Sequence, residues 1–197
     1  AGSHEQDQLQ TLRSFELLGR TANTVVDGDL VSNEDWSGGA LFAPPSAESF
    51  QISVTALEDP RTHPIFLGIA PRDSDLTMVN FFSTGGGIFL CLGGQASESL
   101  MSALGAPGGP AMHAFGERRA LQDMPVAEAG STVELHYTEA KGESGEVEGH
   151  LCFLLSDSAG VLHQIRPVLG RPLRRGGWCP CLLLCLPGTR VQVKRLA

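Results

Sequence analysis

The chain has 197 residues, of which 42% are hydrophobic, and a net charge of −8. This length suits one domain with a core large enough to fold without disulfides or metal. The negative charge argues against general nucleic-acid binding, and no apolar run approaches the ~20 residues of a membrane-spanning helix.

The first segment, residues 1–22, is predicted to be an arm that precedes the domain. It starts with Ala-Gly-Ser-His, which resembles a remnant of tag cleavage. The spacing of the apolar residues in this segment favours a short amphipathic helix, or alternatively an extended lead-in segment, that packs on the rest of the protein by one apolar edge. The apolar residues that recur at every third position are Leu9, Leu12, Phe15 and Leu18.

Residues 23–197 are predicted to form a single all-β domain, an antiparallel two-sheet sandwich. Short apolar segments bounded by Gly, Pro, Asp and Ser recur along them, which is typical of sandwiches rather than of alternating strands and helices. Residues 50–56 alternate between apolar and polar, whereas 65–70 and 88–92 are apolar on both faces. The predicted strands are Thr24–Val26, Ala40–Phe42, Phe50–Ala56, Ile65–Ala70, Thr77–Phe82, Ile88–Leu92, Ala111–Phe115, Thr132–Thr138, His150–Leu155, Val161–Ile165, Cys181–Leu186 and Arg190–Lys194.

The cysteines indicate a reducing compartment. Their number is odd, and all lie in or beside apolar segments, so we expect buried free thiols. No Asn-x-Ser/Thr acceptor is present either. These features favour an intracellular, cytoplasmic protein; the cysteines are Cys91, Cys152, Cys179, Cys181 and Cys185.

No motif for catalysis, a cofactor or a metal appears. Gly85-Gly-Gly87 lacks the Lys-Ser/Thr of a phosphate loop and predicts a hairpin turn. On a strand, Cys181 and Cys185 would lie about 13 Å apart, too far to share a zinc ion. We therefore expect a protein that is not an enzyme. A catalytic site assembled from distant residues, with His136 or His150, stays open as an alternative.

Charge is distributed unevenly along the chain. Residues 121–150 carry seven acidic side chains and one basic one, whereas residues 158–197 carry seven basic and no acidic ones. Pairing between oppositely charged strands would explain this pattern. Alternatively, the basic C-terminal third contacts an acidic partner or RNA.

Six segments, in order, resemble the strands of SPRY domains, and they cover roughly residues 37–195. The neuralized repeat, a relative with the same sandwich, is similar. The first three are Phe50-Gln-Ile-Ser-Val54, Phe66-Leu-Gly-Ile-Ala-Pro71 and Gly87-Ile-Phe-Leu-Cys-Leu-Gly-Gly94. The last three are Gly130-Ser-Thr-Val-Glu-Leu-His-Tyr-Thr138, His150-Leu-Cys-Phe-Leu-Leu-Ser-Asp-Ser-Ala-Gly160 and Cys179-Pro-Cys-Leu-Leu-Leu-Cys-Leu-Pro-Gly-Thr-Arg-Val-Gln-Val193.

The SPRY resemblance implies a concanavalin-like sandwich that acts as a non-enzymatic module and binds a protein or peptide through loops at one end. Loop tryptophans beside arginines are typical of binding hot spots, and packing in the core is the alternative for both tryptophans. The candidate contacts are Trp36, Arg72, Asp73, Asp75, Arg174, Arg175 and Trp178. The alternative is a lectin-like carbohydrate-binding domain, for which Asp73 and Asp75 are the acids that calcium binding could use.

Overall fold

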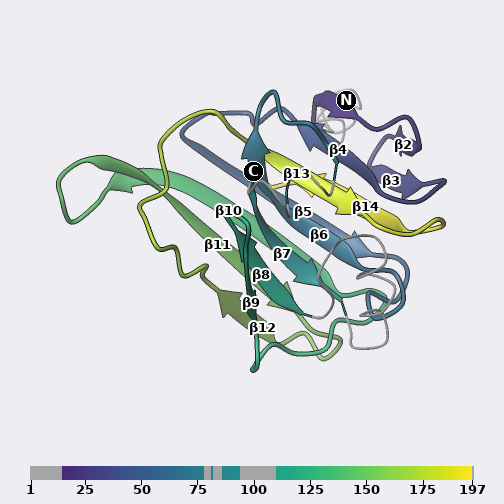
Figure 1. The fold of residues 1–197 in the computed structure, drawn as a ribbon. Coiled ribbons are helices and arrows are strands. Elements are labelled where there is room, and N and C mark those ends of the chain that lie inside the picture. The colour runs from purple at the N-terminus through teal and green to yellow at the C-terminus, as the bar shows by residue number, and fades with distance from the viewer. Residues whose placement is uncertain (1–14, 78–80, 82–85, 94–109, 197) are drawn as a thin grey trace, which may run out of the picture.

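Two antiparallel sheets form a β-sandwich (Figure 1). The computed structural model describes residues 15–77, 81, 86–93 and 110–196. In spatial order, sheet A contains β1 (Leu17–Arg20), β4 (Gly38–Phe42), β13 (Trp178–Leu184), β6 (Ile65–Pro71), β7 (Ile88–Leu92), β8 (Ala111–Ala114) and β9 (Glu117–Ala120). Sheet B contains β12 (Leu162–Ile165), β11 (Val147–Ser156), β10 (Thr132–Lys141), β5 (Ser49–Ala56), β14 (Arg190–Arg195), β3 (Leu30–Asn33) and β2 (Thr24–Asp27).

The all-β prediction is confirmed, and every predicted strand is present except residues 77–82, most of which lie outside the described residues. Gly85 of the predicted hairpin turn lies outside them as well. From Phe15 onward the N-terminal segment is extended and enters sheet A as β1, so the extended alternative holds for its described part. Across the described ranges, no helix is long and apolar enough to span a membrane.

Strands β1, β3 and β9 are absent from the predicted set. Each has only four residues. Strand β9 is Glu-Arg-Arg-Ala and is exposed throughout at the edge of sheet A, so it shows no apolar alternation. Pairing with a neighbouring strand, which a local pattern does not report, makes these segments strands.

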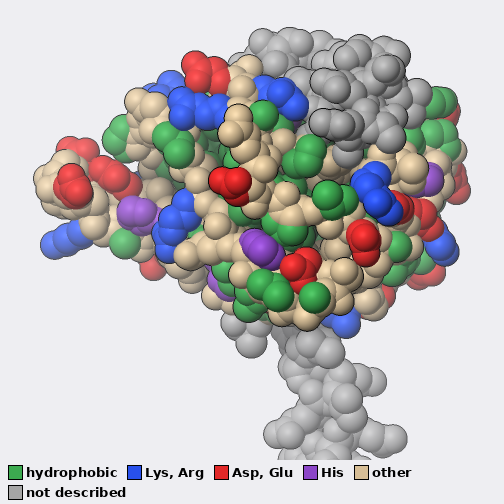
Figure 2. Space-filling model, turned by 90° about the horizontal axis from the view of Figure 1, so that it is seen from below, with side chains coloured by type: hydrophobic (Ala, Val, Ile, Leu, Met, Phe, Trp, Pro, Cys, Tyr) green, Lys and Arg blue, Asp and Glu red, His purple; other side chains and the backbone are tan. Residues whose placement is uncertain are grey.

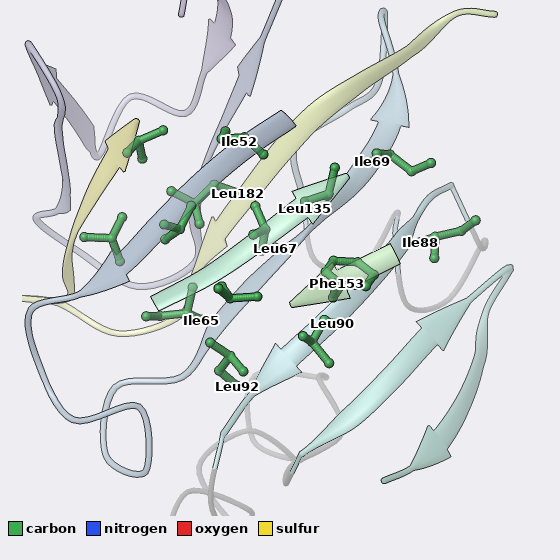
Figure 3. Packing of buried hydrophobic residues seen from close by; sticks show 14 of the residues in the cluster. Ile52, Ile65, Leu67, Ile69, Ile88, Leu90, Leu92, Leu135, Phe153 and Leu182 are labelled. Atoms are coloured by element: carbon green, nitrogen blue, oxygen red, sulfur yellow. The ribbon is translucent and has the colours of Figure 1, made fainter. Parts of the chain in front are cut away.

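The main core lies between the two sheets. Side chains from sheet B, such as Ile52, Leu135 and Phe153, meet side chains from sheet A, such as Leu67 and Leu90 (Figure 3). All are fully buried. The alternation of β5 and β10 therefore reflects one face in this core and one face toward solvent.

The outer face of sheet A is also apolar and buried. It holds Phe66 and Phe89, and Phe81 packs against Phe89 with ring centroids 4.8 Å apart. This second cluster explains why β6 and β7 are apolar at successive positions. In β13, Cys181 and Leu183 join the outer cluster, while Leu182 and Leu184 join the core between the sheets, as alternation along a strand requires.

The approach of β6 to β7 depends on Gly68. A Cβ atom added at this position would lie 1.8 Å from the main-chain oxygen of Ile88. Any side chain here would force the two strands apart, so glycine is required at this point of sheet A.

Candidate functional site

The loop between β12 and β13 crosses from the edge of sheet B to the middle of sheet A, at one end of the sandwich (Figure 1). We call residues 166–177 the crossover segment. Leu173 attaches this segment to sheet B. Its side chain is buried, and its main-chain oxygen accepts a hydrogen bond from the N–H of Gly149 in β11 over 3.0 Å. A Cβ atom on Gly149 would lie 2.8 Å from the Tyr137 ring, so this close contact requires glycine.

Glu139 ties the crossover segment to sheet B. Its Oε1 atom accepts hydrogen bonds from the hydroxyl of Tyr137 over 3.1 Å and from the N–H of Gly176 over 2.6 Å. Burial, with the Glu139 carboxylate beside it, raises the pKa of Tyr137 far above its ordinary value. Tyr137 is therefore a neutral donor throughout the physiological range, which holds Glu139 in place for Gly176.

The end of the crossover segment presents a tryptophan. Gly176 and Gly177 have φ angles of 75° and 74°, a left-handed conformation in which a Cβ atom costs roughly 1–2 kcal/mol per residue. The turn that they form leads into Trp178, the first residue of β13. The indole N–H of Trp178 donates to the main-chain oxygen of Arg174 over 2.7 Å, so the ring is oriented by the segment itself.

A second aromatic ring faces the same segment from the β8–β9 turn. The guanidinium carbon of Arg171 lies 4.0 Å from the centroid of Phe115, a cation–π contact. Phe115 has a φ of 52°, which is strained for a bulky side chain. Such strain persists where the surrounding structure enforces it, and it concentrates at functional sites.

These residues line one groove, which we call the Trp178 groove. Its volume is about 820 Å³. The side chains that line it are basic, aromatic or prolines, and none is acidic: Pro71, Phe115, Arg171, Pro172, Arg174, Arg175 and Trp178. Across the part of the chain that the structure describes, no ion pair involves any of the three arginines.

A second hollow, which we call the Glu148 hollow, adjoins the Trp178 groove. It has a volume of about 720 Å³ and lies between the crossover segment and the β10–β11 hairpin. Arg174 and Arg175 line it on one side, and Glu146 and Glu148 on the other. In Figure 2 acidic side chains gather at the tip of the hairpin that protrudes at the left, with basic ones nearby.

The structure brings most of the predicted contact residues to one end of the sandwich. Trp178 pairs with Pro71 across β13 and β6, so the exposed turn that carries Arg72, Asp73 and Asp75 begins beside it. Pro71 lines the Trp178 groove with Arg174 and Arg175, but the three residues of the turn do not. The groove thus combines the end of β6 with a loop about 100 residues later in the sequence.

Trp36 lies at the opposite end. It is 47% exposed, and the N–H of the next residue, Ser37, donates to the oxygen of Cys185, just past the end of β13. Trp178 begins the same strand, so roughly 20 Å of strand separates the two tryptophans. They cannot contribute to one compact site.

Phe115 and Arg171 are two groove residues that the sequence did not indicate as contacts. Phe115 has the sequence pattern of a strand end, and only the turn before β9 directs its ring to the crossover segment. Arg171 is one of several arginines in the basic C-terminal third, and its cation–π partner is distant in sequence.

The two histidines considered for catalysis lie on the exposed face of sheet B. His136 pairs with Cys152, and His150 pairs with Thr138. These residues line a small hollow of about 230 Å³, and His136 Nε2 lies 2.8 Å from Glu134 Oε2.

Among the described residues that line this hollow, none is acidic and Cys152 has the one thiol. Within the described ranges, no group of three or more His, Cys, Asp or Glu side chains could hold a metal ion. Cys152 Sγ contacts Gln164 Nε2 at 3.3 Å. All five cysteines are free thiols.

Comparison with known proteins supports the fold but assigns no family. No family model matches the chain, and neither does any curated protein. The seed lectin of Lotus tetragonolobus is 10% identical, with a TM-score of 0.50, over 93% of this chain and 93% of the lectin.

Two further solved structures are similar. Lectin I-B4 of Griffonia simplicifolia in its metal-free form is 12% identical over 90% of each chain, with a TM-score of 0.48. A Bacillus subtilis protein of unknown function with a galectin-like fold is 12% identical over 90% of this chain and 86% of that one, with a TM-score of 0.45. The two antiparallel sheets and the likeness to the Lotus tetragonolobus lectin identify the fold as a concanavalin-like sandwich, as the SPRY resemblance implied, whereas membership of the SPRY family stays a prediction.

Proposed function

We propose that the protein is a non-enzymatic binding module that captures a segment of another protein in the Trp178 groove. The observation that carries this proposal is the composition of the groove, in which three arginines without ion-pair partners among the described residues surround Trp178 and Phe115. Tryptophan and arginine are the side chains enriched at interface hot spots.

The support of the groove is consistent with this role. Trp178 is held by Arg174, Gly176 is held by Glu139, and the crossover segment is fixed to the core at Leu173. A preorganised site loses less conformational entropy when a partner binds. The free thiols support a location in a reducing, intracellular compartment.

Selection from a random peptide library on the immobilised protein tests the proposal. We expect enrichment of peptides that bind the wild type at least about tenfold more tightly than they bind the double variant Arg174→Ala/Arg175→Ala, because charge-assisted hydrogen bonds are lost. Arg61→Ala is the matched control, since it removes an exposed arginine that pairs with Asp59 away from the groove. Equal binding by the double variant, or failure to enrich any peptide, would overturn the proposal.

Carbohydrate binding is the second candidate function. The hollow on the exposed face of sheet B is lined by hydrogen-bonding side chains, among them His136, His150 and Gln164. The solved structure with a TM-score of 0.50 is a lectin. A glycan array probed with the wild type and with His150→Ala tests carbohydrate binding. A glycan that binds the wild type but not the variant would support this function. Binding of no glycan by the wild type would contradict it.

A further inference from the structure

The Trp178 groove and the Glu148 hollow share three residues, Pro172, Arg174 and Arg175. The two arginines thus stand on a common wall, and a ligand that fills the groove can continue past them into the hollow. Both arginines are exposed. The shared wall makes the two spaces parts of one extended surface.

Along this surface the character of the lining changes in a fixed order. On the groove side are the aromatic rings of Trp178 and Phe115. The shared wall is cationic, and the far side of the hollow carries the carboxylates of Glu146 and Glu148. No ion pair joins these glutamates to the arginines within the described ranges.

The acidic far side argues against a uniformly anionic ligand. A nucleic acid or another polyanion that is held at Arg174 and Arg175 would extend toward Glu146 and Glu148 and be repelled there. The β10–β11 hairpin carries further acids at Glu139 and Glu143, and the whole chain has a net charge of −8. A peptide can instead present both signs of charge and an apolar side chain within a short length.

We infer, on the basis of the proposed function, that the occupant is an extended peptide with three features in linear order: a large aromatic side chain, an acidic side chain and a basic side chain. The aromatic side chain packs on Trp178 and Phe115 in the groove. The acidic side chain pairs with Arg174 and Arg175, and the basic one points to Glu146 and Glu148. A phosphorylated side chain supplies the same anionic chemistry as a carboxylate at the middle position.

The test uses fluorescein-labelled synthetic peptides, acetylated and amidated, that contain one Trp, one Glu and one Lys. Gly and Ser residues separate these by one to three positions, in every order, and a parallel set carries phosphoserine in place of Glu. Fluorescence anisotropy measures the affinity of each peptide for the full chain. We expect peptides with the acidic residue in the middle to bind about fivefold more tightly than peptides with Lys in the middle.

Charge reversal on the protein gives the sharper readout. In peptides that carry Glu in the middle and either Lys or Glu at the third position, the variant Glu146→Lys/Glu148→Lys should reverse the preference at the third position from Lys to Glu, by about fivefold. Glu143→Lys is the matched control, because this acid lies on the same hairpin but does not line the hollow, and the preference should persist. A further peptide with Gln in place of the middle Glu should bind the wild type more weakly, and Arg174→Ala/Arg175→Ala should abolish this difference.

The outcomes separate this inference from the proposed function. If library peptides bind and depend on Arg174 and Arg175, but the order of charges has no effect, the inference is wrong and the proposed function stands. If no peptide binds at all, the proposed function fails. Tighter binding of single-stranded RNA than of any peptide overturns both.

Discussion

The indole N–H of Trp178 donates a hydrogen bond to the main-chain oxygen of Arg174, over 2.7 Å and across the two glycines that form the turn between them. This bond connects the aromatic wall of the Trp178 groove to the backbone that carries its cationic wall. Because both walls depend on one turn, a small change at Trp178 should alter recognition by the arginines as well.

Replacing Trp178 by Phe tests this connection. Phe keeps an aromatic surface but loses the N–H donor, and a single hydrogen bond contributes about 0.5–1.5 kcal/mol. We expect the affinity for a library-selected peptide to fall about two- to tenfold, with the melting temperature nearly unchanged, as measured by calorimetry. An unchanged affinity would show that the bond does not organise the groove. Trp36→Phe, at the other end of the sandwich, serves as the control.

His113 should make the protein sensitive to acid. Burial lowers its pKa from 6.5 to about 4, and Arg118, which pairs with it across β8 and β9, acts in the same direction. Because the folded state keeps His113 neutral, its contribution to the free energy of unfolding is fully present above pH 6.5. This contribution is lost as the pH falls from 6.5 toward 4. Between pH 7 and pH 4 the loss amounts to roughly 3 kcal/mol.

Urea unfolding at several pH values measures this loss. His113→Gln, which cannot titrate, should remove the corresponding part of the pH dependence, whereas His150→Gln, at an exposed position, should leave it in place. If the wild type and His113→Gln lose stability in parallel, other groups account for the acid sensitivity.

The five free thiols should differ sharply in reactivity. Only the thiolate reacts with a disulfide reagent, and burial raises the pKa of Cys91 to about 12 and also raises that of Cys181 and Cys185. Cys152, on the exposed face of sheet B, is half-buried. We expect one thiol to react rapidly in the folded protein at pH 8, none in Cys152→Ser, and all five after unfolding. A second fast thiol in the native state would contradict the burial of the outer face of sheet A.

The buried Asn33 should contribute more to stability than the half-buried Asn23. The buried side chain of Asn33 donates to the main-chain oxygens of Asp35 and Leu184, the latter over 3.1 Å, and its carbonyl oxygen accepts from Thr24. Asn33→Ala leaves several buried groups unsatisfied and should lower the free energy of unfolding by about 2 kcal/mol or more.

Asn23→Ala is the matched control. Asn23 is half-buried, but its side chain donates to the oxygen of Trp36 in a bond that solvent reaches, so water can replace the bond and the loss should stay within about 0.5 kcal/mol. Chemical denaturation of the two variants makes the comparison. Similar losses would mean that the Asn33 contacts add nothing beyond an ordinary surface bond.

The alternation of β5 and β10 and the two-sided apolar runs of β6 and β7 were sufficient to predict an all-β sandwich, because a half-buried strand and a fully buried one leave different periodic patterns. The short strands β3 and β9 could not be predicted, because their pairing partners rather than their own residues make them strands.

For the candidate site, the amino-acid pattern was sufficient to identify the components: arginines and glycines in one irregular segment, followed by a tryptophan, with no motif for catalysis. Which of these components meet depends on the arrangement of the strands. The pairing of β13 with β6 brings Pro71 to Trp178, and the β8–β9 turn brings Phe115 to Arg171. The same register sends Trp36 to the far end of β13. Such distances follow from strand order and register, which depend on contacts between residues far apart in the chain.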